Sequence, residues 1–330
     1  MPETSDRSLP QNAPLFVGVV VPVYNEAEGI EAFHALLRGT IDPLPERFFI
    51  YYVDDGSTDG TRDKLAALSQ SDPRIRVLTL VRNFGHQAAL TAGLDAAEGD
   101  VVISMDGDGQ HPPALIPQLL TLYRAGYAIV QTQRLDDERV GLFKKLTSRG
   151  FYWLIQKMSN TPIQPGTADF RLMSREAVEG LKRMREYHRF LRGMIPWMGF
   201  KTVILPFTPT ERLAGQSKYS LRKMSKLAED AIFSFSLLPL RIALISGALF
   251  FILALFEGVN VAIIYLQGKQ YLLAPGWASL MFVSLINGGL VLVNIGIVGT
   301  YIAFILQEVK KRPIYMVRED KDRGNPTESR

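Results

Sequence analysis

Two long apolar runs in the last third of the chain constrain its fold more than any other feature. Residues 240–266 and 278–306 each reach the roughly 20 residues that a helix needs to cross a bilayer. Glu257 is the only acidic residue of the first run, and the second run has no charged residue. The alternative is a pair of buried helices in a soluble protein, but such helices rarely stay apolar over this length. We therefore predict two transmembrane helices joined by a short loop.

Basic residues around these runs predict the orientation, because lysine and arginine concentrate on the cytoplasmic side of membrane proteins. The loop between the runs, residues 267–277, contains one basic residue, Lys269. The basic residues that flank the pair are Arg212, Lys218, Arg222, Lys223 and Lys226 before it, and Lys310, Lys311 and Arg312 after it. We expect a multi-pass protein of the plasma (inner) membrane with both termini in the cytoplasm. Residues 231–238 (AIFSFSLL) are predicted to be an amphipathic helix in the membrane interface.

The chain before the runs has the pattern of an α/β domain. Residues 1–14 are polar and are interpreted as a disordered tail, and residues 15–230 as one domain; residues 231–312 form the membrane part and 313–330 a cytoplasmic tail. The β-rich apolar runs are 16–23, 48–53, 75–80, 101–105 and 129–133, and helix-length amphipathic segments lie at 30–37, 62–68, 88–97 and 115–123. This alternation predicts a Rossmann-like, mostly parallel sheet with helices on both faces. Ligands of such sheets bind beyond the carboxyl ends of the strands.

Acidic motifs follow two of the predicted strands. Residues 54–60 read DDGSTDG and residues 106–110 read DGDGQ. Alternate residues of an extended segment point the same way, so the carboxylates of Asp106 and Asp108 can reach one cation. Oxygen ligands favour Mg²⁺ or Mn²⁺. A calcium-binding EF-hand loop is excluded, because Ala66 and Pro117 stand at the twelfth positions, where a glutamate is required.

Basic residues downstream are candidates for contacts with phosphate groups, because arginine donates paired hydrogen bonds to phosphate oxygens. The alternative is that they are ordinary solvated charges. Gly215 and Ser217 suggest a flexible loop between two of these residues, able to close over a substrate. The candidates are Arg134, Arg171, Arg212 and Lys218.

Composition narrows the possible partners. The chain has 330 residues and no cysteine, which excludes disulfides, thiolate metal sites and a cysteine nucleophile. A formal net charge of +4 is weak evidence for a nucleic-acid partner. The mean hydropathy of +0.07 is high for a soluble enzyme and low for a chain embedded mostly in a membrane. An average over a cytosolic domain and a membrane hairpin accounts for this value.

Several stretches taken together resemble the inverting GT-A glycosyltransferases that act on polyprenyl phosphates. This group includes the dolichol-phosphate mannose synthases and the bacterial bactoprenol glucosyltransferases, and the paired apolar runs favour the second branch. That branch often reads DADLQDP where this chain has Gly107, Gly109 and His111. The stretches that carry the resemblance, in chain order, are VPVYNE, VDDGS, RNFGH, DGDGQHP, GTADFRLM and RLAGQSKY.

The resemblance implies a role for each candidate residue. It places Pro22, Tyr24 and Glu26 at the nucleotide base and Asp55 toward the uridine. It implies that Asp106, Asp108 and Gln110 hold the divalent ion against the donor diphosphate, and that Asp169 is a base or an orienting residue. The four basic candidates would then bind the acceptor phosphate and the donor diphosphate.

The implied activity is transfer of a hexose, glucose from UDP-glucose, to undecaprenyl or another polyprenyl phosphate with inversion. The alternatives within the same fold are a mannose (GDP-mannose) or amino-sugar transferase. A non-catalytic membrane scaffold is the alternative from another class, and a homo-oligomer is compatible with all of these. A nucleotidyltransferase is disfavoured, because the first strand is not followed by a glycine-rich loop with a basic residue. A processive polysaccharide synthase is disfavoured too, because the chain lacks a QxxRW motif.

Overall fold

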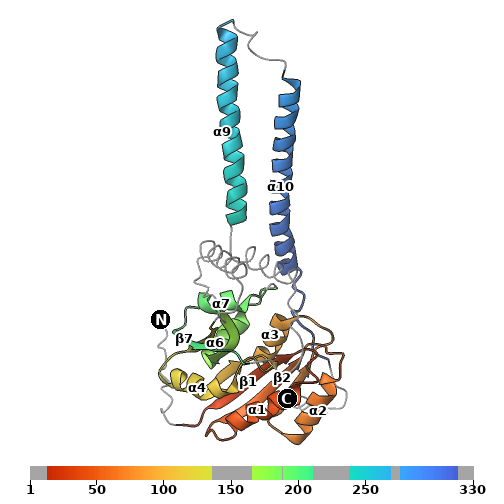
Figure 1. Cartoon of the computed structure of the whole chain (residues 1–330), viewed down its shortest axis with the longest axis vertical. Coiled ribbons are helices and arrows are strands. Elements are labelled where there is room, and N and C mark those ends of the chain that lie inside the picture. The colour runs from red at the N-terminus through yellow and green to blue at the C-terminus, as the bar shows by residue number, and fades with distance from the viewer. Residues whose placement is uncertain (1–12, 136–165, 188, 211–237, 269–275, 319–330) are drawn as a thin grey trace, which may run out of the picture. The chain divides into compact units, whose positions relative to one another are not determined.

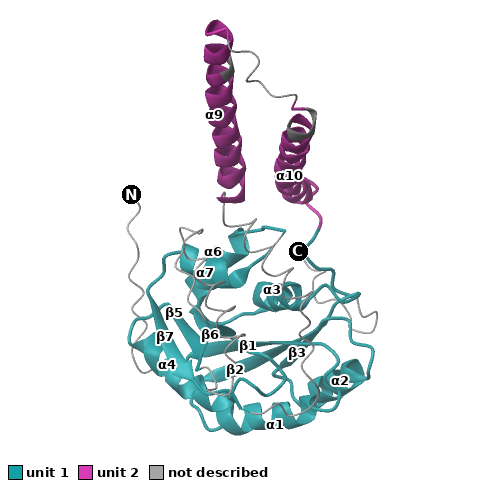
Figure 2. Ribbon diagram, turned by 45° about the horizontal axis from the view of Figure 1, so that its top comes forward, with its two compact units in different colours: residues 1–153, 161–220, 313–330 teal, residues 154–160, 221–312 magenta. Residues whose placement is uncertain are grey.

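The computed structural model describes residues 13–135, 166–187, 189–210, 238–268 and 276–318. These residues belong to two compact units (Figure 2). The first contains the sheet, and the second contains two long helices. The strands are β1 (Phe16–Val23), β2 (Arg47–Asp54), β3 (Ile75–Thr79), β4 (Val101–Ser104), β5 (Ile129–Arg134), β6 (Thr167–Ser174) and β7 (Thr202–Phe207). The helices are α1 (Ile30–Ile41), α2 (Thr61–Ser71), α3 (His86–Ala96), α4 (Ile116–Arg124), α6 (Arg175–Arg183), α7 (Leu191–Trp197), α9 (Leu238–Leu266) and α10 (Trp277–Val309), with a short 3₁₀ turn at Pro113–Leu115.

The seven strands of the first unit form one sheet in the order β3-β2-β1-β4-β6-β5-β7. All neighbouring pairs are parallel except the two that involve β6, which runs antiparallel between β4 and β5. The predicted mostly parallel α/β sheet is therefore confirmed, and the five predicted strands appear at their expected positions to within one residue. The antiparallel β6 is an addition that the alternating pattern does not predict.

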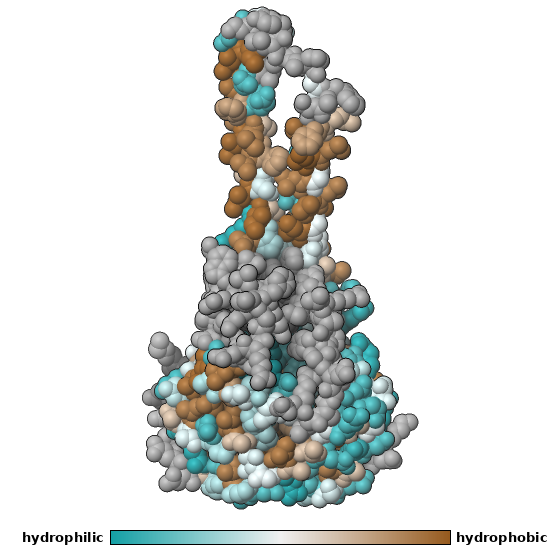
Figure 3. Space-filling view, in the orientation of Figure 1, coloured by the Kyte–Doolittle hydropathy of each residue, from teal (hydrophilic) through white to brown (hydrophobic). Residues whose placement is uncertain are grey.

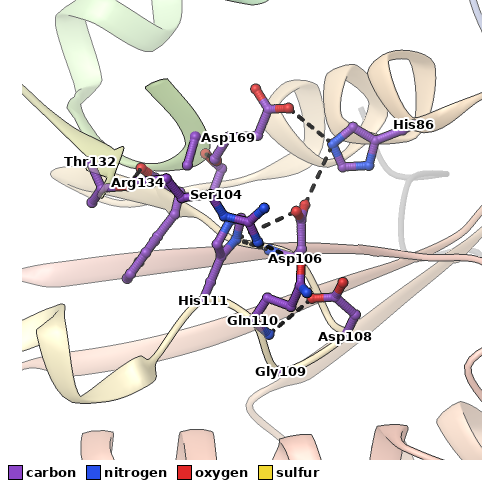
Figure 4. A network of polar contacts seen from close by, with 12 residues as sticks. His86, Ser104, Asp106, Asp108, Gly109, Gln110, His111, Thr132, Arg134 and Asp169 are labelled. Atoms are coloured by element: carbon purple, nitrogen blue, oxygen red, sulfur yellow. Dashed lines mark hydrogen bonds and ion pairs between the residues drawn. The ribbon is translucent and has the colours of Figure 1, made fainter. Parts of the chain in front are cut away.

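Helices cover both faces of this sheet (Figure 1). Side chains of α1, α2 and α4 pack on one face in a core with alternate residues of β1, such as Val19 and Val21. On the other face, Ala89 and Ala92 of α3 pack against Val53 and Leu80. Small side chains on α3 let this helix lie close to the strands, and α3 begins directly beside the carboxyl end of β4 (Figure 4).

The end of β5 lies beside the start of β6. The backbone N–H of Arg134, at the end of β5, donates to the carbonyl oxygen of Gly166 over 2.9 Å. The side chains of Ser104 and Thr132, on the two neighbouring strands, donate to the carbonyl oxygens of Asp169 and Phe170. These bonds fix β6 between its neighbours.

The described residues of the second unit contain α9 and α10, which lie at the positions of the two predicted apolar runs. Each helix is long and apolar enough to cross a membrane. Large apolar side chains are exposed along both helices (Figure 3), Phe251, Leu285 and Leu292 among them. In water such a surface is unfavourable. The predicted interfacial segment, residues 231–238, lies outside the described residues except for Leu238, and so does the predicted N-terminal tail except for Ala13 and Pro14.

Candidate active site

The acidic motifs meet at the edge of the sheet that is formed by the carboxyl ends of its strands, because β1 lies between β2 and β4. The chain leaves β1 toward β2 on one side, whereas β4 lies on the other side, so strand order reverses at this point. Open α/β sheets bind ligands at such reversals, beyond the carboxyl ends of the strands. The predicted site residues that follow β1, β2 and β4 all lie at this edge.

The turn after β1 is hydrogen-bonded to the turn after β2. The N–H of Asn25 donates to Ser57 Oγ, and the N–H of Thr58 donates back to Asn25 Oδ1, each over 2.9 Å. Tyr24 and Glu26 lie in this joined pair of turns, with Tyr24 exposed. Pro22 instead is buried inside β1, paired with Val53 of β2. Of the three residues expected at the base, Pro22 therefore has no exposed ring at this position.

Asp55 binds the loop that precedes α3. Its two carboxylate oxygens accept hydrogen bonds from the N–H groups of Phe84 and Gly85, at 2.7 and 3.0 Å. Burial raises the pKa of Asp55, and the two backbone hydrogen bonds oppose the increase. Asp55 thus fixes the RNFGH stretch against the turn after β2.

The chain turns directly after Asp106 and does not continue as an extended strand. The expectation that alternate positions point Asp106 and Asp108 the same way is therefore wrong in its geometry. Gly107 is needed here, because a Cβ atom would lie 2.8 Å from Val23 Cγ1. Gly109 has a φ of +82°, which side chains other than glycine rarely adopt. The two glycines that depart from the DADLQDP pattern thus fit a tighter turn, in which Asp108 Oδ1 accepts the N–H of Gln110 over 3.0 Å.

His111 is hydrogen-bonded to the backbone of this turn. Its Nδ1 atom accepts the backbone N–H of Asp106 over 2.9 Å, and its ring stacks on Phe170 at 5.4 Å between centroids. Only 2% of the residue is exposed, and this burial lowers the pKa of His111. A neutral imidazole with its proton on Nε2 fits this role, because a protonated Nδ1 cannot accept. His111, whose role the sequence leaves open, thus holds the backbone of Asp106 in this turn.

Asp169, on β6, is the most heavily paired acid of the site. It is 4% exposed, and its Oδ1 accepts from Arg171 Nη2 over 2.5 Å, while its Oδ2 accepts from Arg192 Nη2 over 3.0 Å. Burial raises its pKa, but Arg192, His86 and Arg171 lower it more strongly, so the pKa of Asp169 lies well below its ordinary value. A carboxylate held in this way is a weak base and a strong orienting group.

His86 lies between Asp106 and Asp169 (Figure 4). Its Nε2 atom is 3.5 Å from Asp106 Oδ1 and 3.4 Å from Asp169 Oδ2, and 42% of its side chain is exposed. Burial lowers the pKa of His86, but the two carboxylates raise it by more than burial lowers it, and the pKa is about 9. His86 and Arg192 were not among the residues predicted from the sequence. His86 lies in the RNFGH stretch, so that signal was present, whereas nothing in the stretch around Arg192 distinguishes it from a surface charge.

The four basic candidates do not share one position. Arg134 Nη2 donates to Gln110 Oε1 over 2.5 Å, so Arg134 lies at the acidic turn. Arg171 is 1% exposed and its Nη2 bonds to Asp169 and to the carbonyl oxygen of Ala168, which makes it part of the core. Arg212 and Lys218 lie outside the described residues.

The acidic turn has the chemistry of a divalent cation site. Among the described residues no cluster of three or more acidic, histidine or cysteine side chains is arranged as a metal site. Magnesium, however, is commonly held by one or two carboxylates together with substrate phosphates. Asp106 Oδ1 accepts no hydrogen bond, and a cation bound there would replace its ion pair with His86, 3.5 Å away. Asp106 and Asp108 therefore fit such an ion, whereas the amide oxygen of Gln110 is already bonded to Arg134.

Comparison with known proteins shows similarity over most of the chain. Residues 18–181 match the family model "Glycosyl transferase family 2". The SfII prophage-derived bactoprenol glucosyl transferase of Shigella flexneri is 38% identical over 94% of this chain and 99% of its own length. The glycosyltransferase YkcC of Bacillus subtilis is 38% identical over 91% of this chain and 93% of its own. A mannosyltransferase from Pyrobaculum calidifontis, solved with GDP-Man and Mn²⁺, is 17% identical and aligns with a TM-score of 0.44 over 92% of this chain and 89% of that one.

Proposed function

Because the chain belongs to glycosyl transferase family 2, we propose that it transfers glucose from UDP-glucose to a polyprenyl phosphate, with inversion at the sugar carbon. One observation carries this proposal. The relatives named bactoprenol glucosyl transferase match this chain along nearly its whole length, the two apolar helices included. The chain is a glycosyltransferase, and the proposal concerns its donor, acceptor and stereochemistry.

The donor half of the site is assigned to the edge formed by β1, β2 and β4. Tyr24 and Glu26 lie in the turn where the nucleotide base would bind, with Pro22 supporting that turn and Asp55 ordering the loop beside it. Asp106 and Asp108 would hold a Mg²⁺ or Mn²⁺ ion against the diphosphate, with Gln110 bracing the turn. When bound, such an ion neutralises the charge that develops on the leaving nucleoside diphosphate.

The chemistry needs no strong base. A phosphate monoester has a second pKa near 6, so the acceptor oxygen is largely ionised at neutral pH and is already a nucleophile. Its oxygen forms a bond to the sugar C1 while the bond from C1 to the diphosphate oxygen breaks, and the electron pair leaves with the nucleoside diphosphate. In-line attack converts an α-linked donor into a β-linked lipid phosphosugar.

The low pKa of Asp169 agrees with this scheme. We assign it the role of orienting His86 and Arg192, with Arg171 as its buried partner. His86 and Arg192 then present positive charge toward the phosphate groups. Arg134 at the acidic turn, together with Arg212 and Lys218 on the later RLAGQSKY stretch, is proposed to bind the acceptor phosphate and the donor diphosphate.

The two apolar helices give the enzyme access to a lipid substrate. A polyprenyl tail stays in the bilayer, so the catalytic domain must work where the phosphate meets water. The basic residues that flank the helices support a topology at the plasma membrane in which this domain and both termini are cytoplasmic. An anionic cytoplasmic leaflet would attract the same basic residues.

A panel assay tests the proposal. Membranes that contain the protein are incubated with undecaprenyl phosphate and, separately, with UDP-glucose, UDP-N-acetylglucosamine and GDP-mannose. Glucose should reach the lipid, in a β linkage, and only when Mg²⁺ or Mn²⁺ is present. Transfer of mannose or of the amino sugar would replace the proposed donor. Asp108→Ala should abolish transfer in a protein that still folds, and an Asp108→Ala protein with full activity would overturn the cation assignment.

A further inference from the structure

The residues that follow α10 pair with the edge of the sheet in the first unit. We call residues 313–318 the C-terminal strap. Leu80 and Val317 form an antiparallel bridge, flanked by hydrogen bonds from Arg318 N–H to the Thr79 carbonyl (2.7 Å) and from Val81 N–H to the Met316 carbonyl (3.0 Å). Leu80 directly follows β3, an edge strand, so the strap satisfies the Thr79 carbonyl and the Val81 N–H at the end of that open edge. The predicted cytoplasmic tail thus begins as part of the catalytic domain.

Tyr315 fixes the strap through its side chain. The phenol donates to Asp95 Oδ2 over 2.9 Å, and Arg185 Nη1 donates to the same oxygen over 2.6 Å. Burial, followed by the bond to Asp95, raises the pKa of Tyr315 to about 12, so the phenol remains a donor at neutral pH. The ring packs against the cluster that includes Val53 and Leu80. The strap is therefore held by its backbone just after β3 and by the hydrogen bond from Tyr315 to Asp95 of α3.

The strap is joined to the donor side of the site through one short loop. Val81, which bonds to Met316, begins the loop 81–85. Phe84 and Gly85 at its other end donate their N–H groups to Asp55. Phe84 also packs on the same apolar cluster as Tyr315. The strap thus contacts one end of the loop, and the other end orders Asp55 and leads into His86.

We propose that the C-terminal strap is a positioning segment for the nucleotide end of the donor site. It holds loop 81–85 in the conformation in which Phe84 and Gly85 bind Asp55, so nucleotide affinity depends on residues that follow the second apolar helix. The proposal rests on the proposed function for its ligand, a uridine diphosphate donor. Its structural part, the order of the loop, does not depend on the donor.

Two truncations and one point variant test the strap in the full membrane protein, reconstituted in lipid nanodiscs. Termination after Arg312 removes the strap, and termination after Arg318 is the matched control that keeps it. Tyr315→Phe removes only the phenol donor. Each protein is examined by hydrogen exchange of the peptide that covers residues 82–86 and by calorimetric titration with UDP.

Termination after Arg312 should increase exchange at Phe84 and Gly85 and weaken UDP binding by roughly 5- to 30-fold. Tyr315→Phe should weaken it by roughly 2- to 10-fold, the range for one neutral hydrogen bond. The protein ending at Arg318 should match the full chain in both measurements. In transfer assays the KM for the nucleotide sugar should rise in both strap variants, while the KM for undecaprenyl phosphate stays the same.

Unchanged exchange at Phe84 and Gly85, both in the Tyr315→Phe variant and in the protein ending at Arg312, would overturn the proposal. If the protein ending at Arg312 does not fold, Tyr315→Phe alone decides, since it leaves the backbone of the strap in place. A full chain that does not bind UDP would contradict the proposed donor, and the exchange data would then still decide the role of the strap. Loss of UDP affinity on removal of residues 319–330 alone would also overturn it.

Discussion

Substitution of His111 by phenylalanine separates two contributions of this residue, its hydrogen bond and its ring. Phenylalanine keeps an aromatic ring against Phe170 but cannot accept the N–H of Asp106. A buried donor without a partner costs about 1–3 kcal/mol. In the free enzyme the turn at Asp106 can relax so that this N–H bonds to water. A bound cation draws the turn back to its original position, and the N–H then lacks a partner, which lowers the affinity for the cation. The affinity for Mn²⁺ should fall by roughly 5- to 150-fold, because about 1.4 kcal/mol corresponds to tenfold.

The matched control is His111→Asn, whose Oδ1 atom can accept the same N–H but which has no ring. We expect His111→Asn to retain most of the Mn²⁺ affinity and to lose stability, because the contacts with Phe170 and Phe207 disappear. Mn²⁺ titrations of transfer activity and of bound ion by electron paramagnetic resonance, together with thermal unfolding, measure the two effects. Wild-type Mn²⁺ affinity in His111→Phe, or equal loss in both variants, would refute the assignment of His111 as the acceptor for Asp106.

Three further predictions concern the neighbouring residues. Arg134→Ala should raise the KM for undecaprenyl phosphate with little change in protein yield, and an unchanged acceptor dependence would remove Arg134 from the acceptor site. Gly107→Ala should lower activity and thermal stability together, by about 1–3 kcal/mol in stability, because the added Cβ meets Val23 Cγ1 at 2.8 Å. In the metal-free protein, NMR titration should show His86 protonated below its raised pKa of about 9 and neutral above it. Asp169→Asn should move that midpoint down toward 6.5, since one of the carboxylates that stabilise the charged imidazole is lost; a midpoint that stays near 9 would contradict the pairing.

Hydrophobic periodicity accounts for most of the fold between residues 16 and 134. The strands there are nearly continuous apolar runs, because parallel strands are buried on both faces. The same reasoning misses β6, since Asp169 and Arg171 interrupt its apolar pattern, although all eight of its residues are buried. The two charges neutralise each other across 2.5 Å, and only a tertiary structure shows that pairing.

The acidic part of the site could be predicted from the strand pattern, and the positions of His86 and Arg192 could not. Asp106, Asp108 and Asp55 follow strands whose order can be inferred, so their common edge could be predicted. His86 and Arg192 come from separate helices, and their approach to Asp169 depends on how those helices pack. The strap could not be predicted either, because residues 313–318 are too short a segment to show any periodicity, and the bridge between Leu80 and Val317 joins positions more than 200 residues apart.

The bond between Arg134 and Gly166 has a consequence for how enzymes of this kind can diverge. It pins together both ends of the connection between β5 and β6, directly beside the acidic turn. Once the ends of a loop are fixed, its closure entropy depends weakly on length, with each doubling costing about 0.6 kcal/mol. A change of chain length between Arg134 and Gly166 is therefore expected to leave the pairing of β5 with β6 intact.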